Sequence, residues 1–175
     1  TQLEKNALDL AFDGAAIVAS KIISLAHLWS VVRVQGGAYG TNCGTGRGGD
    51  FSATSYRDPS PYKSIDAYRA IPQFLRDFAN SDGNLTQYII SVMGDLDPLR
   101  SPADVAGYHC SFVMNHESYD ALCQVRKEVL ATTKEKLLEW ADKYEKIMQT
   151  GTFCVVGFDE ALQKCEKENL VVEDL

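Results

Sequence analysis

A guanidinium and a phenol lie six residues apart in the sequence, at Arg33 and Tyr39, on either side of the pair Gly36-Gly37. Both are hydrogen-bond donors that can stabilise negative charge on a substrate without being consumed. By residue type alone, a structural role is the favoured interpretation of both residues. Arg33 falls in the last turn of an expected helix, where a cation offsets unpaired carbonyls. Tyr39 would open the following strand as a half-buried aromatic.

An apolar helix is expected to carry Arg33. Residues 14–35 are rich in Ala, Ile, Leu and Val and predict a helix with a break near Ser24. Two glycines at Gly36-Gly37 permit a left-handed cap and predict the end of this helix. An α-helical period would place four apolar side chains on one buried face: Leu25, Leu28, Trp29 and Val32.

A β-hairpin is expected to carry Tyr39. Residues 38–43 and 51–56 are strand-like, and the turn formers at 44–50 separate them. The spacing Gly44-x-Gly46-x-x-Gly49 also matches a dinucleotide-binding fingerprint, but that motif requires a helix to follow the glycines. A strand is expected there instead, so the glycines indicate a hairpin tip rather than a nucleotide site.

The rest of the chain predicts mainly helices. A helix over 64–80 with a kink at Pro72 is followed by helices over 85–93, 103–114, 118–131, 133–150 and 159–167. Residues 88–92 are also β-prone, which leaves a strand open as an alternative for that segment. Thr132 and Glu135 have the spacing of a capping box.

Two further segments predict short strands, at 153–156 and at 170–172. The resulting fold class is α+β, with an antiparallel sheet that packs helices on one face, and residues 1–175 are expected to form a single domain. Because the chain begins at Thr1 without an initiator methionine, a processed or shortened chain is expected.

The composition argues against two classes of binding partner, nucleic acids and membranes. The chain has 175 residues, of which 45% are hydrophobic, and a formal net charge of −7. Sequence-independent nucleic-acid binding needs clustered Lys and Arg, so nucleic acid is not expected as a partner. The apolar runs are interrupted too often to predict a membrane span, so no membrane partner is expected and the domain should be soluble.

Five cysteines, an odd number without a C-x-x-C pair, predict free thiols in a reducing compartment, either the cytoplasm or an organelle matrix. Cys43, Cys110 and Cys154 sit in apolar segments and are expected to be buried. The three histidines, His27, His109 and His116, lie too far apart for a zinc motif. No metal site is therefore expected in this chain.

A family resemblance appears at the segment that contains the arginine and the tyrosine. Leu28-Trp29-x-x-Val32-Arg33-Val34-Gln35-Gly36-Gly37-Ala38-Tyr39-Gly40, followed by Phe51-Ser52-x-x-Ser55-Tyr56-Arg57-Asp58-Pro59, resembles the C-terminal domain of presequence peptidases. Those enzymes are insulinase (pitrilysin-type) zinc metallopeptidases. The resemblance continues at 95–98 and 126–133 and so covers nearly the whole chain.

The resemblance implies a division of labour within a larger peptide-degrading enzyme. An N-terminal half would supply an H-x-x-E-H zinc site, and the C-terminal half would close over the peptide substrate. Arg33 would hold a carbonyl or carboxylate, Tyr39 would donate to the oxygen that becomes anionic during hydrolysis, and Gly36 and Gly37 would line the substrate site. The present chain has no zinc motif. A non-catalytic scaffold or assembly subunit on the same fold is the alternative.

Overall fold

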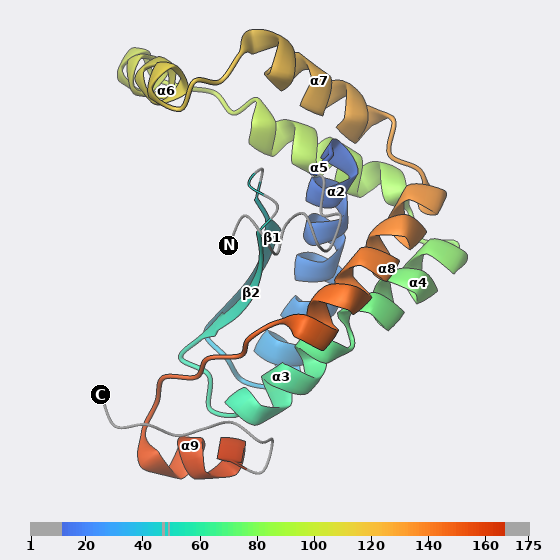
Figure 1. Ribbon diagram of the computed structural model, residues 1–175, viewed down its shortest axis with the longest axis vertical. Helices are drawn as coiled ribbons and strands as arrows, with labels where there is room; N and C mark the ends of the chain where they lie inside the picture. Colours follow the sequence, from blue (N-terminus) through green and yellow to red (C-terminus); the bar gives the residue numbers. More distant parts are fainter. Residues whose placement is uncertain (1–11, 47, 49, 167–175) are drawn as a thin grey trace.

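The computed structural model describes residues 12–46, 48 and 50–166, and Figure 1 shows them as a crescent of helices around a β-hairpin. Its elements in chain order are α2 (Gly14–Ile22), the π-helix η1 (Ile23–Gln35), β1 (Gly40–Thr45), β2 (Phe51–Tyr56), α3 (Pro61–Arg69), α4 (Ile71–Asn80), α5 (Leu85–Leu96), α6 (Pro102–Met114), α7 (Tyr119–Leu130), α8 (Lys134–Thr150) and α9 (Asp159–Glu166).

The helix formed by α2 and η1 is the centre of the fold. The hairpin packs on it through β1, while α5, α7 and α8 contact α2 from other sides, and α4 and α8 lie side by side. The hairpin is antiparallel, with Gly40 opposite Tyr56 and Thr45 opposite Phe51. The predicted α+β class is confirmed to the extent that a small antiparallel sheet accompanies a mainly helical chain.

The central helix changes its hydrogen-bond pattern at Ile23, close to the break expected at Ser24. Bonds of the i→i+5 type follow, as between the Gly36 N–H and the Val31 carbonyl at 2.9 Å. The wider turn buries side chains at intervals of five and four residues: Ile23, Leu28 and Val32.

The predicted buried face of this helix is therefore wrong at two positions. An α-helical period was expected to bury Leu25 and Trp29, but in the π-helical segment they are 47% and 43% exposed. The joined helix Gly14–Gln35 has the length and mean hydropathy, 1.7, of a membrane span. Core helices share that property, and 56% of the apolar window is buried inside the protein.

Hydrogen bonds from Trp140 and Tyr144 join α8 to the central helix. The Trp140 indole N–H donates to Asp13 Oδ1 at 2.8 Å, and Asp13 also caps α2. The buried Tyr144 hydroxyl lies 3.3 Å from Ser20 Oγ and 2.9 Å from Thr45 Oγ1. Burial raises the pKa of Tyr144, so its phenol stays protonated and can bond both hydroxyls. Three large side chains of α8 are buried on the face that packs inward: Leu137, Trp140 and Tyr144.

The N-cap of α8 and the break between α3 and α4 differ from the prediction. The N-cap of α8 is Thr133, whose hydroxyl accepts from the Lys136 N–H at 3.4 Å. Thr132 is buried and donates to the Glu128 carbonyl at 3.1 Å, so the capping box expected from Thr132 and Glu135 is wrong. The kink expected at Pro72 is a full break, with the proline in the first turn of α4.

The segment expected to be a strand at 153–156 is irregular instead. Among the described residues, no backbone hydrogen bond joins residues 152–157 to any neighbour. A strand needs a paired backbone beside it, and the described chain places no strand there. The helix expected at 85–93 is confirmed as α5, so the strand alternative there is wrong. The strand expected at 170–172 lies outside the described residues.

The cysteine prediction is confirmed at one of three positions. Cys43 is buried, and burial raises the pKa of its thiol to about 12, with a hydrogen bond from Ser20 opposing this in part. Cys110 and Cys154 are exposed, so their expected burial is wrong. Cys110 lies on α6, which buries none of its residues in the described structure, and Cys154 lies in the irregular segment.

Two glycines give a matched test of helix packing. A Cβ on Gly14 would lie 2.5 Å from the Val129 nitrogen and 2.7 Å from the Val125 carbonyl oxygen, both backbone atoms of α7. Gly14→Ala should therefore lower the free energy of unfolding by roughly 1–3 kcal/mol, because α2 must move away from α7. A Cβ on Gly94 of α5 would meet nothing within 4 Å. Gly94→Ala should therefore raise the free energy of unfolding by about 0.5–1 kcal/mol. Urea denaturation measures both; equal effects would contradict the close approach at Gly14.

Candidate active-site surface

The structure brings Arg33 and Tyr39 into direct contact. Arg33 Nε donates to the Tyr39 carbonyl at 3.0 Å, across the turn between η1 and β1. The Tyr39 N–H donates in turn to the Tyr56 carbonyl at 3.1 Å. Both backbone groups of Tyr39 are thus fixed, although the residue precedes β1 by one position.

The Tyr39 side chain is left available on the surface. It is 67% exposed, and its hydroxyl bonds to no other side chain or backbone group of the described chain. Its ring packs edge-on against Tyr56, with centroids 6.1 Å apart. The Arg57 guanidinium lies 5.7 Å from the Tyr39 ring and 5.4 Å from the Tyr56 ring. The expected half-buried strand aromatic is instead an exposed phenol on a fixed backbone.

Arg33 is oriented by stacking as well as by its hydrogen bond. Its guanidinium lies 4.0 Å from the centre of the exposed Trp29 ring, a geometry that gives a favourable cation–π interaction. The bond to Tyr39 uses Nε, and no other hydrogen bond of Arg33 occurs among the described residues. Its two terminal nitrogens can therefore donate to a bound carbonyl or carboxylate.

The glycine pair shapes the turn between these two side chains. The Gly36 and Gly37 N–H groups donate to the Val31 and Arg33 carbonyls, at 2.9 and 3.0 Å. A Cβ on Gly36 would lie 2.5 Å from the Val32 carbonyl oxygen, and Gly37 has a φ of +81°, which favours glycine. Since both N–H groups close the helix, any substrate contact here would have to use the other backbone atoms.

Sequence reasoning missed three neighbours of the pair: Trp29 as a surface ring, Tyr56 and Arg57. Tyr56 is the last residue of β2 and Arg57 follows it, and the hairpin register brings both beside Tyr39. End-to-end pairing of the expected strands, 38–43 and 51–56, would have placed Tyr56 opposite Ala38, whereas its observed partner is Gly40. Asp58 then closes the strand by accepting from the Ser60 N–H at 2.8 Å and from the Ser64 hydroxyl.

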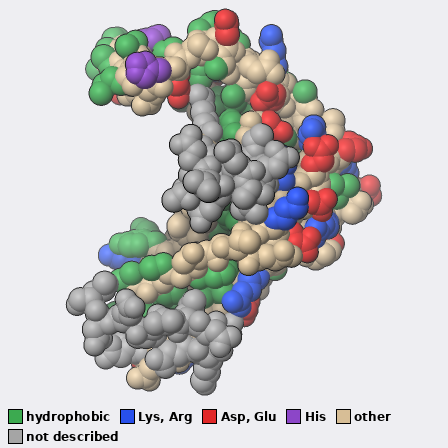
Figure 2. All heavy atoms as spheres, viewed as in Figure 1, with side chains coloured by type: hydrophobic (Ala, Val, Ile, Leu, Met, Phe, Trp, Pro, Cys, Tyr) green, Lys and Arg blue, Asp and Glu red, His purple; other side chains and the backbone are tan. Residues whose placement is uncertain are grey.

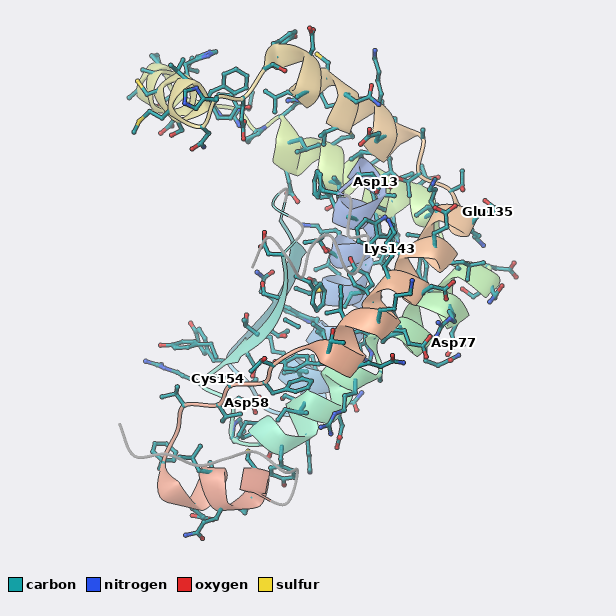
Figure 3. The ribbon with its side chains drawn as sticks, viewed as in Figure 1. Asp13, Asp58, Asp77, Glu135, Lys143 and Cys154 are labelled. Atoms are coloured by element: carbon teal, nitrogen blue, oxygen red, sulfur yellow. The ribbon has the colours of Figure 1, made fainter. Side chains whose placement is uncertain are left out.

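A groove runs along the outer edge of β2 from this cluster. It has a volume of about 880 Å³ and lies between β2 and residues 147–158, with Ile65 and Tyr68 of α3 also lining it. Asp58 and Cys154, both labelled in Figure 3, line the same groove. Figure 2 shows that charged side chains gather over α4 and α8.

The described residues do not fit a metal ion. Within residues 12–46, 48 and 50–166, no three side chains of His, Cys, Asp or Glu converge. The glycine-rich turn likewise leads from β1 into β2 rather than into a helix, which contradicts a dinucleotide fingerprint; Gly49 itself lies outside the described residues.

Two distant segments quoted for the family resemblance meet in space. Arg126 of α7 binds the Asp97 carboxylate at the end of α5, with Nε 3.1 Å from Oδ2 and Nη2 close to Oδ1. The hydrogen bond from Arg126 lowers the pKa of Asp97. The Arg126 guanidinium also donates to the Leu96 carbonyl at 3.4 Å and so caps α5. This contact joins helices rather than forming part of the exposed site.

Comparison with known proteins agrees with these features. Residues 7–158 match the family model described as the PreP C-terminal domain. The chain is 35% identical over 162 residues to presequence protease 1, chloroplastic/mitochondrial, of Arabidopsis thaliana, covering 89% of the chain and 14% of that protein. It is 30% identical over 153 residues to protein HypA of Clostridium perfringens, covering 87% and 16%.

A third relative, the mitochondrial presequence protease of Saccharomyces cerevisiae, is 28% identical over 148 residues, covering 83% of the chain and 15% of that protein. The chain belongs to the family of presequence-protease C-terminal domains. It is thus similar to one part of a peptidase, and it spans about one seventh of the length of these relatives.

Proposed function

We propose that this chain is the substrate-clamping C-terminal domain of a zinc-dependent metalloendopeptidase that degrades peptides. The observation that carries the proposal is the exposed phenol of Tyr39 on a backbone fixed at both its N–H and its C=O, beside a guanidinium with free donors. A fixed donor costs little reorganisation when negative charge develops on a substrate oxygen. The partners would be the N-terminal catalytic half of the same enzyme and peptide substrates, with no nucleic acid or membrane.

The two side chains have different roles in this proposal. Tyr39 donates its hydroxyl to the carbonyl oxygen of the scissile bond as that oxygen becomes anionic. Arg33 binds a neighbouring carbonyl or carboxylate of the peptide and also holds the Tyr39 backbone. Gly36 and Gly37 let the peptide approach this turn closely, because neither carries a side chain.

Zinc would be held outside this chain, in the N-terminal half, because the described residues offer no ligand set for it. The chain alone would then bind peptide weakly and hydrolyse none. Relatives with chloroplastic and mitochondrial names suggest an organelle matrix as the location. The family match supports the fold of an insulinase-type domain, and residues 1–175 would form one domain within it.

The Arg33 role is tested by substitution in the whole peptidase. Arg33→Ala should raise KM and lower kcat/KM by about 10- to 100-fold, since bonds to charged groups contribute roughly 1.5–3 kcal/mol. Arg33→Lys should recover little, because an ammonium lacks the planar fork that binds Tyr39 and substrate together. Lys136→Ala, which removes the same charge from the exposed face of α8, serves as the control. Steady-state kinetics with wild-type KM for Arg33→Ala would refute the anchor.

A further inference from the structure

A second arginine lies beside the Tyr39 ring, at the end of β2. The Arg57 guanidinium lies 5.7 Å from the centre of the Tyr39 ring and 5.4 Å from that of Tyr56, and all three residues are exposed. This guanidinium forms no hydrogen bond within the described part of the chain. Its five N–H donors are thus available to a ligand, while its attraction to two rings orients it.

The backbone of Arg57 has an uncommon conformation. Its φ is 48°, a value that residues other than glycine seldom adopt. Such conformations persist where the surrounding structure holds them, and they concentrate at functional sites. Here the Arg57 carbonyl accepts from the Tyr39 N–H at 3.4 Å. A Cβ on Gly37 would lie 3.4 Å from Pro59 Cγ. Arg57 is therefore held against the same glycine turn as Arg33.

Arg57 lacks the carboxylate partner that several other arginines of the chain have. Carboxylates are not scarce, because Asp and Glu outnumber Lys and Arg by 24 to 17. The adjacent Asp58 carboxylate accepts instead from the Ser60 N–H and the Ser64 hydroxyl. Ion pairs do form elsewhere: Arg69 with Asp66, Arg76 with Asp142 and Glu145, and Arg126 with Asp97. Arg57 and Arg33 form none among the described residues, so two unpaired guanidiniums lie around one exposed phenol.

We infer that Arg57 binds a carboxylate of the peptide substrate and makes this surface selective for peptides that carry one close to the scissile bond. The inference rests on the proposed function, in which Tyr39 donates to the scissile carbonyl. A guanidinium binds a carboxylate through two parallel N–H···O bonds, and the carboxylate is the anionic group of an unmodified peptide. Arg33 is less free for this role, because its Nε already donates to the Tyr39 carbonyl.

The place of Arg57 limits where the carboxylate lies in the peptide. The guanidinium is 5.7 Å from the centre of the Tyr39 ring, and an extended peptide advances about 3.3 Å per residue. The carboxylate therefore belongs to a residue within about three positions of the scissile bond. It is either the side chain of an Asp or Glu or the C-terminal carboxylate of the peptide, and the chemistry of recognition is the same.

Two other roles of Arg57 predict a different result. If Arg57 only held the Tyr39 and Tyr56 rings in place, its loss would weaken the binding of every peptide to the same extent. An ion pair with a carboxylate elsewhere in the whole polypeptide would also act on every peptide alike. Selectivity between matched peptides with and without a carboxylate therefore distinguishes substrate binding from both roles.

Binding of matched peptides to the whole polypeptide tests the inference. One Glu is moved along a short peptide that has blocked ends and no other acidic residue, and each peptide is paired with its Gln counterpart. Fluorescence anisotropy gives Kd in the presence of a chelator, which prevents hydrolysis. At one or two adjacent positions, Glu should bind about 10-fold more tightly than Gln, the usual contribution of a hydrogen bond to a charged group. In Arg57→Gln this preference should disappear.

Arg100→Gln is the matched control. Arg100 also stacks on a tyrosine, with its guanidinium 4.3 Å from the Tyr108 ring, but it lies in the loop before α6. Its substitution should leave the preference for Glu unchanged. Arg57→Lys should keep only part of the preference, because an ammonium retains the charge without the planar fork. The melting temperature of Arg57→Gln should equal that of the wild type, because glutamine keeps the Cβ and the backbone carbonyl.

A second series of peptides identifies the source of the carboxylate. Peptides without Glu that end in a free carboxylate are shortened one residue at a time and compared with amidated peptides. Tighter binding at one length, lost in Arg57→Gln, would identify the C-terminal carboxylate. The inference would be overturned if the wild type preferred neither Glu nor a free end, if Arg57→Gln kept the preference, or if Arg57→Gln weakened Glu and Gln peptides equally. Hydrolysis is not measured, so this failure is distinguishable from failure of the proposed function.

Discussion

Tyr39→Phe in the whole peptidase is expected to lower kcat by about 10²–10³-fold, the usual loss when one donor to a developing oxyanion is removed. The fold should not change, because the Tyr39 hydroxyl bonds to nothing in the described chain and the side chain is 67% exposed. Its contacts with Tyr56 and Arg57 use the ring, which phenylalanine keeps. The measurements are kcat, KM and the melting temperature on one preparation.

Tyr56→Phe provides the matched control for Tyr39→Phe. Tyr56 is 59% exposed, and its ring also lies near the Arg57 guanidinium, at 5.4 Å. The same hydroxyl is removed from the neighbouring ring, so kcat should stay at the wild-type value. Wild-type kcat in Tyr39→Phe would leave the chain with no part in the chemistry and would favour the scaffold alternative.

Trp140→Ala in the 175-residue chain is expected to lower the free energy of unfolding by about 3–5 kcal/mol, the range for buried aromatic residues. Trp140 is 1% exposed and donates to Asp13, which also caps α2. The substitution therefore opens a cavity between α8 and the central helix and leaves the Asp13 carboxylate with one donor fewer. Urea denaturation gives the value.

Trp29→Ala removes the same side chain from the surface and is the control. Trp29 is 43% exposed and stacks on Arg33, so its loss should cost no more than about 1 kcal/mol. Should Trp140→Ala fail to fold, Trp140→Phe keeps most of the ring and should give an intermediate loss. Equal losses at the two tryptophans would mean that both lie in the core.

Local patterns predicted most of the helices and the hairpin, because caps, glycines and periodicity act over a few residues. The prediction for Trp29 is wrong for a physical reason: the face that a helix buries depends on its turn, and a π-helix cannot be distinguished from an α-helix by composition. The 153–156 segment has the sequence of a strand, but a strand also requires a neighbour, which a local pattern does not supply.

The candidate site was predictable in its residues but not in its contacts. Arg33 and Tyr39 came from a short motif, whereas the bond between them depends on how the Gly36-Gly37 turn closes. The approach of Arg57 depends on the hairpin register. Long-range pairs such as Asp97 with Arg126, 29 residues apart, are fixed by the packing of α5 against α7. Residue types alone do not determine which carboxylate an arginine meets.

The thiols of this chain divide into buried and accessible groups, which makes it suitable for site-selective labelling. Cys43 and Cys165 are buried. Burial raises the pKa of Cys43 to about 12, so its thiol stays protonated and unreactive. Cys110 is exposed on α6, at one end of the crescent in Figure 1, and Cys154 is exposed beside the groove. Once the half-buried Cys123 is replaced by serine, a donor and an acceptor fluorophore could be attached at these two natural positions. Energy transfer between them would then report how far the crescent bends when peptide binds.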